Sequence, residues 1–192
     1  MTLTRTGLPP HTVATDSRSR TSTRSERDFL SAADSDEPGQ RLYGWSAKLK
    51  QSPRGDTTFR RYQAHLNEIL ADPTFAVPRS LVHGDLINRN VHVADGKVTG
   101  LFDWGCSMYG DALYELAWFQ FWAPWHPNID VTLLEAELER RWDAASAVMS
   151  DRQRRLTACY LYIGLGHLAY NAHLEDWGEV AAVEERLDTL IS

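Results

Sequence analysis

The stretch that decides the fold is "SLVHGDLINRNVHVADGKVTGLFDWG", residues 80–105. Within it, the dipeptide Asp95-Gly96 lies between "VHVA" and "KVTGLF", two short runs rich in β-forming residues. An Asp-Gly pair between such runs is typical of a two-residue hairpin of type I′, in which both turn residues take positive φ. We therefore expect a β-hairpin in which Ala94 pairs with Lys97.

This hairpin is expected to bring together two side chains that carry oxygen. Continuing the ladder from its turn places Asn90 opposite Leu101, and Asp103 then shares the face of Asn90 two residues further along. Diagonal neighbours across such a ladder lie roughly 7–8 Å apart. Side chains that converge from there can share one ion of Mg²⁺ size, which binds oxygen at about 2.1 Å. The hairpin thus predicts half of a magnesium site, built from an amide and a carboxylate.

A third polar group precedes the hairpin. Asp85 stands in "HGD", five residues before Asn90, in a loop that follows the strand-like "SLV". The order H-x-D-x-x-x-x-N, followed by an Asp after a hairpin, is the arrangement that kinases use for phosphoryl transfer. In that arrangement the first Asp accepts the proton of the acceptor hydroxyl, while the Asn and the second Asp hold magnesium on the nucleotide phosphates. His83 is then expected to order the loop and not to act as the base.

The chain beyond this stretch is expected to be mostly helical. "TTFRRYQAHLNEILA", residues 57–71, has apolar residues at helical spacing and stops at Asp72-Pro73. "DALYELAWFQFW" is apolar nearly all round, which predicts a buried helix with Asp111 as its N-cap and Pro124 beyond its end. Amphipathic helices are predicted over three further segments: residues 132–149, 152–174 and 180–191.

The segment "GLGHLA", residues 164–169, raises an alternative, because G-x-G-x-x-A occurs in dinucleotide-binding sites and would suit an NAD-dependent enzyme. Its apolar residues continue at helical spacing, and no strand carrying a terminal acid follows. We therefore expect these glycines to pack helices together, and a helix over residues 156–174 would exclude the dinucleotide site.

Composition limits the class of protein and its partners. The 192-residue chain has a net charge of −6, which argues against nucleic acid or an anionic membrane surface as a main partner. Cys106 and Cys159 form neither a disulfide framework nor a zinc spacing, so a cytoplasmic location is expected. Residues 1–40 are rich in Ser, Thr and Arg and predict a disordered tail, which leaves residues 41–192 as one lobe.

The quoted motifs also carry a family resemblance. "VHGDLINRNV", "GLFDW" and the "GDALYELA" that follows resemble the aminoglycoside phosphotransferase family, and "FWAPW" with "YIGLGHLAYNA" is most similar to its hygromycin-type branch. The resemblance runs from about Tyr43 to the C-terminus. It implies an α+β, mainly α-helical fold: the C-terminal lobe of the protein-kinase-like fold, with a β-hairpin at the catalytic loop. It also implies that Asp111 and Glu115 are the acidic pair of the helix that anchors the core.

The resemblance further implies an activity. Asp85 matches the catalytic aspartate of the family, while Asn90 and Asp103 match the ligands of Mg²⁺ and thereby of the nucleotide. The implied reaction moves the γ-phosphoryl group of Mg·ATP, or of GTP, to a hydroxyl of an aminoglycoside-like or other small molecule. A cationic acceptor would suit the negative net charge of the chain.

Family members carry a β-rich lobe whose Lys holds the nucleotide phosphates, and this sequence offers no such lobe. Residues 1–40 contain no lysine, and the first ones are Lys48 and Lys50. We expect a catalytic lobe that, by itself, binds ATP weakly, if at all, and does not turn it over. The alternative function is that of a non-catalytic pseudokinase fragment that binds a small molecule or a partner protein.

Overall fold

The computed structural model describes residues 46–142 and 151–192, apart from residues 50 and 88. The predicted tail, residues 1–40, and the C-terminal end of the helix predicted over 132–149 lie outside these ranges. The described part is mainly helical, as expected, and none of its helices has the length and apolarity needed to cross a membrane. The helices are α2 (Ser46–Leu49), α3 (Pro53–Ala71), α4 (Leu113–Trp122), α5 (Val131–Trp142), α6 (Arg152–His173) and α7 (Trp177–Ile191). The strands are β1 (Ser80–Val82), β2 (Val91–Ala94), β3 (Lys97–Leu101) and β4 (Met108–Gly110), with 3-10 turns η2 (Trp104–Cys106) and η3 (Ala123–Trp125).

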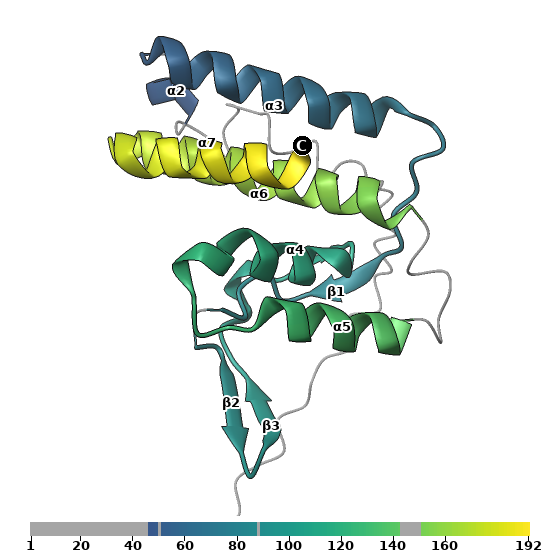
Figure 1. Cartoon of the computed structure of the whole chain (residues 1–192). Coiled ribbons are helices and arrows are strands. Elements are labelled where there is room, and N and C mark those ends of the chain that lie inside the picture. Colours follow the sequence, from purple (N-terminus) through teal and green to yellow (C-terminus); the bar gives the residue numbers. More distant parts are fainter. Residues whose placement is uncertain (1–45, 50, 88, 143–150) are drawn as a thin grey trace, which may run out of the picture.

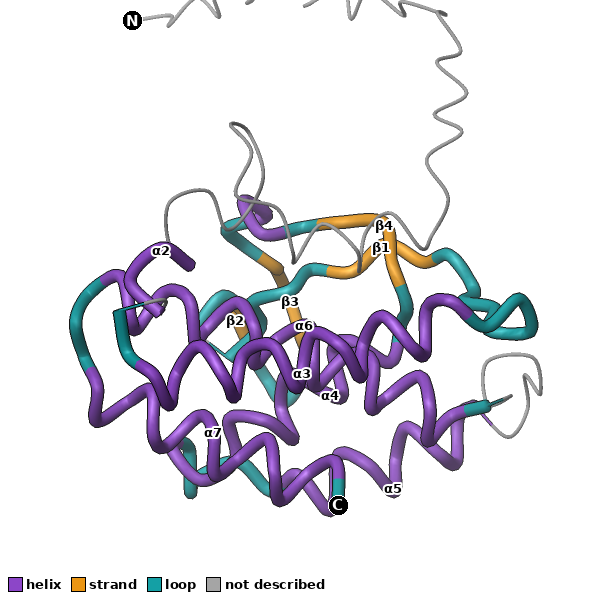
Figure 2. Tube along the Cα trace, turned by 90° about the horizontal axis from the view of Figure 1, so that it is seen from above, coloured by secondary structure: helices purple, strands orange, loops and turns teal. Residues whose placement is uncertain are grey.

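Helix α6 is the centre of the helical body. It packs against α2, α3, α4 and α7, and Figures 1 and 2 show it running between these neighbours. At Gly164 a Cβ atom would lie 2.4 Å from Cδ1 of Leu187, so α7 can cross here only over a glycine. The segment "GLGHLA" therefore lies within one continuous helix and packs helices together, as expected, and the dinucleotide alternative is excluded.

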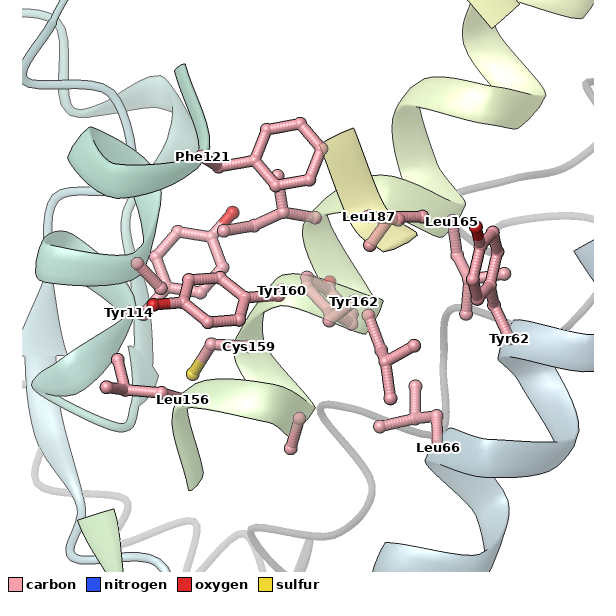
Figure 3. Close-up of a cluster of buried hydrophobic side chains, with 14 of the residues drawn as sticks. Tyr62, Leu66, Tyr114, Phe121, Leu156, Cys159, Tyr160, Tyr162, Leu165 and Leu187 are labelled. Atoms are coloured by element: carbon pink, nitrogen blue, oxygen red, sulfur yellow. The ribbon is translucent and has the colours of Figure 1, made fainter. Parts of the chain in front are cut away.

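The hydrophobic core lies where α3, α4 and α7 meet α6 (Figure 3). Tyr62 of α3 is 1% exposed, and its hydroxyl donates to the backbone oxygen of Glu184 at 3.1 Å and to Oδ1 of Asp188 at 2.8 Å. These bonds satisfy the one polar atom that Tyr62 brings into the core. Phe121 and Leu187, both fully buried, complete the contact between α4 and α7. The core thus holds α4 rigidly against the rest of the body.

The start of α4 corrects one sequence prediction. Ala112, not Asp111, is the N-cap residue, and Asp111 stands one position earlier. Its carboxylate still accepts the backbone N–H of Leu113 at 2.9 Å. The displacement has a cause in packing, because the same buried carboxylate also pairs with the buried guanidinium of Arg155, whose Nε lies 2.7 Å from Oδ2. Asp111 therefore joins the start of α4 to α6.

Two small antiparallel sheets lie beside α4. Strand β1 pairs with β4, so that Leu81 faces Tyr109, and β2 pairs with β3 in the predicted hairpin. Asp95 and Gly96 have φ of 51° and 69°, which confirms the type I′ turn. In Figure 1 the hairpin projects away from the helices.

The hairpin register differs from the predicted one by a residue. Val93 pairs with Val98, but His92 pairs with Gly100, so Thr99 is an extra residue in β3. The bulge is stabilised by the Thr99 hydroxyl, whose oxygen lies 2.6 Å from Nδ1 of His92. Past the bulge, Val91 pairs with Leu101, which places Asn90 opposite Phe102. The predicted pairing of Asn90 with Leu101 was therefore wrong.

Candidate functional site

The site begins at the loop that leaves β1. Gly84 has φ of +79°, a conformation that favours glycine, and a Cβ there would lie 2.8 Å from the backbone oxygen of Cys106. The "HGD" loop can therefore lie directly against η2 only because its middle residue lacks a side chain. This contact brings half-buried Asp85 next to the turn that follows the hairpin.

His83 orders this loop, as predicted from the sequence. The residue is 3% exposed, and its ring lies against Trp104 with 4.7 Å between ring centroids. Nδ1 accepts the backbone N–H of Asp85 at 3.3 Å, which leaves Nε2 to donate to the backbone oxygen of Phe102 at 2.7 Å. With both ring nitrogens engaged by backbone groups, His83 has no lone pair to offer a substrate proton.

Asn90 is brought directly onto Asp85. Its amide Nδ2 donates to the backbone oxygen of Asp85 at 2.7 Å and to the carboxylate Oδ2 at 3.2 Å. Since the amide nitrogen faces Asp85, the amide oxygen Oδ1 faces away from it and can ligate a cation. The N–H of Phe102 also donates to the backbone oxygen of Asn90 at 2.9 Å, which closes the base of the hairpin.

Asp103 reaches the site by a different route from the predicted one. It follows Phe102, whose backbone binds both Asn90 and His83, so its Cα lies one residue from that junction. Asp103 itself is left-handed, with φ of 53° and ψ of 67°, and its Oδ1 accepts the N–H of Gly105 at 3.4 Å. The backbone of Phe102 thus binds Asn90 and His83 and is followed directly by Asp103, whose side chain is exposed to solvent. Shared strand faces, on which the sequence argument relied, have no part in this.

Glu115 is a supporting residue whose role the sequence did not reveal. Its Oε1 accepts the backbone N–H groups of both His83 and Gly84, the latter at 3.2 Å. Its Oε2 is buried and has no hydrogen-bond partner within the described residues. Helix α4 therefore clamps the loop ahead of Asp85 with a carboxylate. The resemblance had marked Glu115 only as part of an acidic pair that anchors the core.

The donor set fits a magnesium ion that is shared with phosphates. Among the described residues there is no cluster of three or more His, Cys, Asp or Glu side chains arranged to hold a metal ion alone. Mg²⁺ is usually bound by one or two protein carboxylates, with water and substrate phosphates filling its other positions. Asp103 with Oδ1 of Asn90 suits that mode of binding, whereas a closed structural metal site would require more ligands.

An aromatic cluster lies further along α4. Trp118 and Trp122 pack on His167 of α6, with ring centroids 5.6 and 4.5 Å away, and Trp122 also contacts Trp125 at 5.2 Å. The indole N–H groups of Trp118 and Trp122 are buried and find no acceptor in the part of the chain that the structure describes. Trp118 and Trp122 follow Glu115 by three and seven residues, so the three share one helix face. That face extends from the clamped loop to the aromatic rings.

Comparisons with known proteins identify the family and the fold. Residues 11–149 match the phosphotransferase enzyme family. The hygromycin-B 4-O-kinase of Escherichia coli is 31% identical over 170 residues, which are 86% of this chain and 44% of that protein. A thermostable mutant of aminoglycoside phosphotransferase APH(4)-Ia, in ternary complex with AMP-PNP and hygromycin B, is 28% identical with a TM-score of 0.65. That match covers 86% of this chain and 51% of the solved one, and the apo form gives the same values. The chain thus spans about half the length of the relatives it matches.

Proposed function

The chain belongs to the phosphotransferase enzyme family, and on this basis we propose that residues 41–192 form the catalytic lobe of a small-molecule kinase. The proposed reaction transfers the γ-phosphoryl group of Mg·ATP to a hydroxyl of an aminoglycoside-like acceptor. One observation carries the proposal: the amide of Asn90 lies on Asp85, next to the backbone junction that presents Asp103. ATP is favoured over GTP as the donor because solved relatives were obtained with AMP-PNP and with ADP.

In this proposal Asp85 is the base. Its carboxylate is half-buried and its backbone is held on both sides, by the His83 ring and by the Asn90 amide. Such a carboxylate can accept the proton of an acceptor hydroxyl as the oxygen attacks phosphorus. Little other covalent chemistry is needed from the protein in phosphoryl transfer, so the role of Glu115 and His83 is to fix where that carboxylate stands.

Asp103 and Oδ1 of Asn90 are the proposed magnesium ligands. When bound, Mg²⁺ neutralises the charge of the phosphate oxygens. Without it, a triphosphate that approaches Asp85 and Asp103 meets two carboxylates and is repelled. Nucleotide binding by this chain should therefore depend on magnesium.

The aromatic cluster is the proposed wall of the acceptor site. The rings of Trp118, Trp122 and Trp125 form a continuous aromatic surface that suits an acceptor built of sugar rings. The apolar faces of sugar rings pack well on aromatic side chains. Three solved structures of the relative carry hygromycin B in their ternary complexes, which supports an aminoglycoside as the acceptor class.

We also propose that a further lobe covers the projecting hairpin when the kinase works. Apolar side chains are exposed on and after it: Val93 58%, Val98 62%, Leu101 38%, Phe102 56% and Trp104 43%. A cluster of exposed apolar residues on this scale is typical of a surface that is covered in the working assembly. Since the matched relatives are about twice as long, their remaining part supplies a model for that cover.

The test is a chimaera. The part of the E. coli kinase that this chain does not match is joined to residues 41–192, and phosphorylation of hygromycin B by Mg·ATP is followed by mass spectrometry. Asp85→Asn should lower turnover by about 10²–10⁴-fold. The matched control is Asp95→Asn, which removes a carboxylate nearby and leaves an Asn-Gly turn that suits type I′ equally well.

Turnover of Asp85→Asn within a few-fold of the unsubstituted chimaera would show that another group takes the proton. A folded chimaera that phosphorylates nothing would instead favour the non-catalytic alternative.

A further inference from the structure

Arg89 is an unusual residue in the catalytic loop. It lies between Asp85 and Asn90, its side chain is exposed, and its backbone is left-handed with φ of 65°. Within the described ranges no hydrogen bond or ion pair of its side chain is found. A left-handed backbone at a residue other than Gly, Asn or Asp is strained, and such strain gathers at functional sites. The loop therefore presents an uncompensated guanidinium next to a proposed magnesium ligand.

The relatives show what else can stand at this position. Solved variants of APH(4)-Ia replace an aspartate with alanine, and others replace the asparagines four and five residues after it. The same spacing in this chain gives Asp85, Arg89 and Asn90. The relative thus carries Asn where this chain has Arg89, and Asn adopts the left-handed conformation more readily. This chain keeps a costlier residue, which also adds a positive charge.

The charge stands where phosphates are expected. Consecutive Cα atoms are about 3.8 Å apart, so the long side chain of Arg89 easily spans the distance to a phosphate held by magnesium on Asn90. A guanidinium donates two parallel hydrogen bonds to phosphate oxygens, which an ammonium or an amide cannot do.

We propose that Arg89 binds the phosphate chain of the Mg·nucleotide, as a cationic group that the catalytic loop of this chain itself supplies. The inference rests on the proposed function, since it takes Asn90 and Asp103 as the magnesium site. It adds a residue for which APH(4)-Ia has an uncharged counterpart. Its role is to hold the phosphates while Asp85 acts on the acceptor.

The test uses the 192-residue chain and two probes, Mg·ATP and Mg·tripolyphosphate, with binding measured by calorimetry at low and moderate salt. Arg89→Asn removes the charge and keeps a residue that tolerates positive φ, so the fold should be unchanged and the thermal midpoint equal or higher. Lys97→Asn is the control, because it removes one positive charge from the exposed hairpin. Asp103→Asn separately tests the magnesium site.

Arg89→Asn should weaken binding of both probes by about tenfold or more, the size expected for hydrogen bonds to a charged group. Arg89→Lys should recover part of the loss, and the salt dependence of binding should become shallower in Arg89→Asn but not in Lys97→Asn. Unchanged affinity in Arg89→Asn overturns the inference. If affinity is unchanged in Arg89→Asn while Asp103→Asn abolishes the magnesium dependence, the proposed function stands and the role of Arg89 does not.

The reverse pattern separates the two claims. A loss in Arg89→Asn with no effect of Asp103→Asn or of magnesium supports an anion-binding role for Arg89 and contradicts the proposed magnesium site. No binding of either probe by the unsubstituted chain overturns the inference about Arg89, whereas the proposed function is decided by turnover of the chimaera.

Discussion

Removing the carboxylate of Asp111 should cost a large share of the stability of the fold. Its partner Arg155 is 1% exposed and Asp111 is 5% exposed, so the pair lies away from water. Deleting one partner of a buried pair typically costs about 3–5 kcal/mol, because the remaining charge stays buried without its counter-charge. Asp111→Ala also removes the acceptor for the N–H of Leu113 at the start of α4. Domains of this size are stable by only about 5–15 kcal/mol, so the variant should be close to unfolding.

Urea denaturation followed by tryptophan fluorescence measures the effect. With a urea dependence of about 2 kcal/mol per molar, the midpoint of Asp111→Ala should fall by about 1.5–2.5 M. The control is Arg60→Ala, which breaks an exposed i, i+4 pair with Asp56 and should change the free energy of unfolding by about 0.5 kcal/mol or less. A midpoint for Asp111→Ala as close to the unsubstituted one as that of Arg60→Ala would refute the reasoning. It would mean that the buried guanidinium is satisfied without this carboxylate.

Three further results are expected. Gly84→Ala should lower the free energy of unfolding by about 2 kcal/mol or more and weaken magnesium-dependent nucleotide binding, because φ is positive there and a Cβ would lie 2.8 Å from the backbone oxygen of Cys106. The control Gly96→Ala, whose Cβ would have nothing within 4 Å, should lose only about 1 kcal/mol. Equal losses in urea titrations would contradict the proposed contact. Burial raises the pKa of the Cys159 thiol, so iodoacetamide at pH 8.5 should modify exposed Cys106 and leave Cys159 unmodified until urea unfolds the chain. Mass spectrometry measures the modification of each cysteine. Modification of Cys159 in the folded chain would contradict its burial. Hydrogen bonds from Thr74 lower the pKa of Asp72 to about 2, below its unfolded value, so this carboxylate stabilises the fold above pH 4 and its contribution is lost as pH falls from 4 toward 2. Asp72→Asn should therefore lose less stability than the unsubstituted chain between pH 4 and pH 2. An equal loss would show that Asp72 is not linked to acid unfolding.

The turn of the hairpin could be predicted from the sequence, and the position of the site residues only in part. Asp95-Gly96 determines its own turn locally, so the prediction held. The bulge at Thr99 depends on a hydrogen bond to His92 across the ladder, and the alternation of residue types along the two strands does not predict this bond. One extra residue there was enough to change the partner of Asn90.

Of the residues that support the site, the sequence predicted the role of His83 and did not reveal that of Glu115. Glu115 binds two backbone N–H groups more than thirty residues earlier in the chain, and such contacts depend on how α4 is placed by the core. The pairing of β1 with β4 likewise joins short segments with no turn between them. In contrast, α3 and α6 carry their own helical periodicity and were predicted nearly to their ends.

The account depends most on magnesium binding at Asn90 and Asp103, and a paramagnetic ion tests this directly. Mn²⁺, which takes similar oxygen ligands, is added with ADP to the isotopically labelled chain, and line broadening of the backbone amide signals is mapped. Broadening should be strongest at residues 85–90 and 102–105 and should disappear in Asp103→Asn. Broadening centred elsewhere in the chain, or unchanged in Asp103→Asn, would contradict the proposed site.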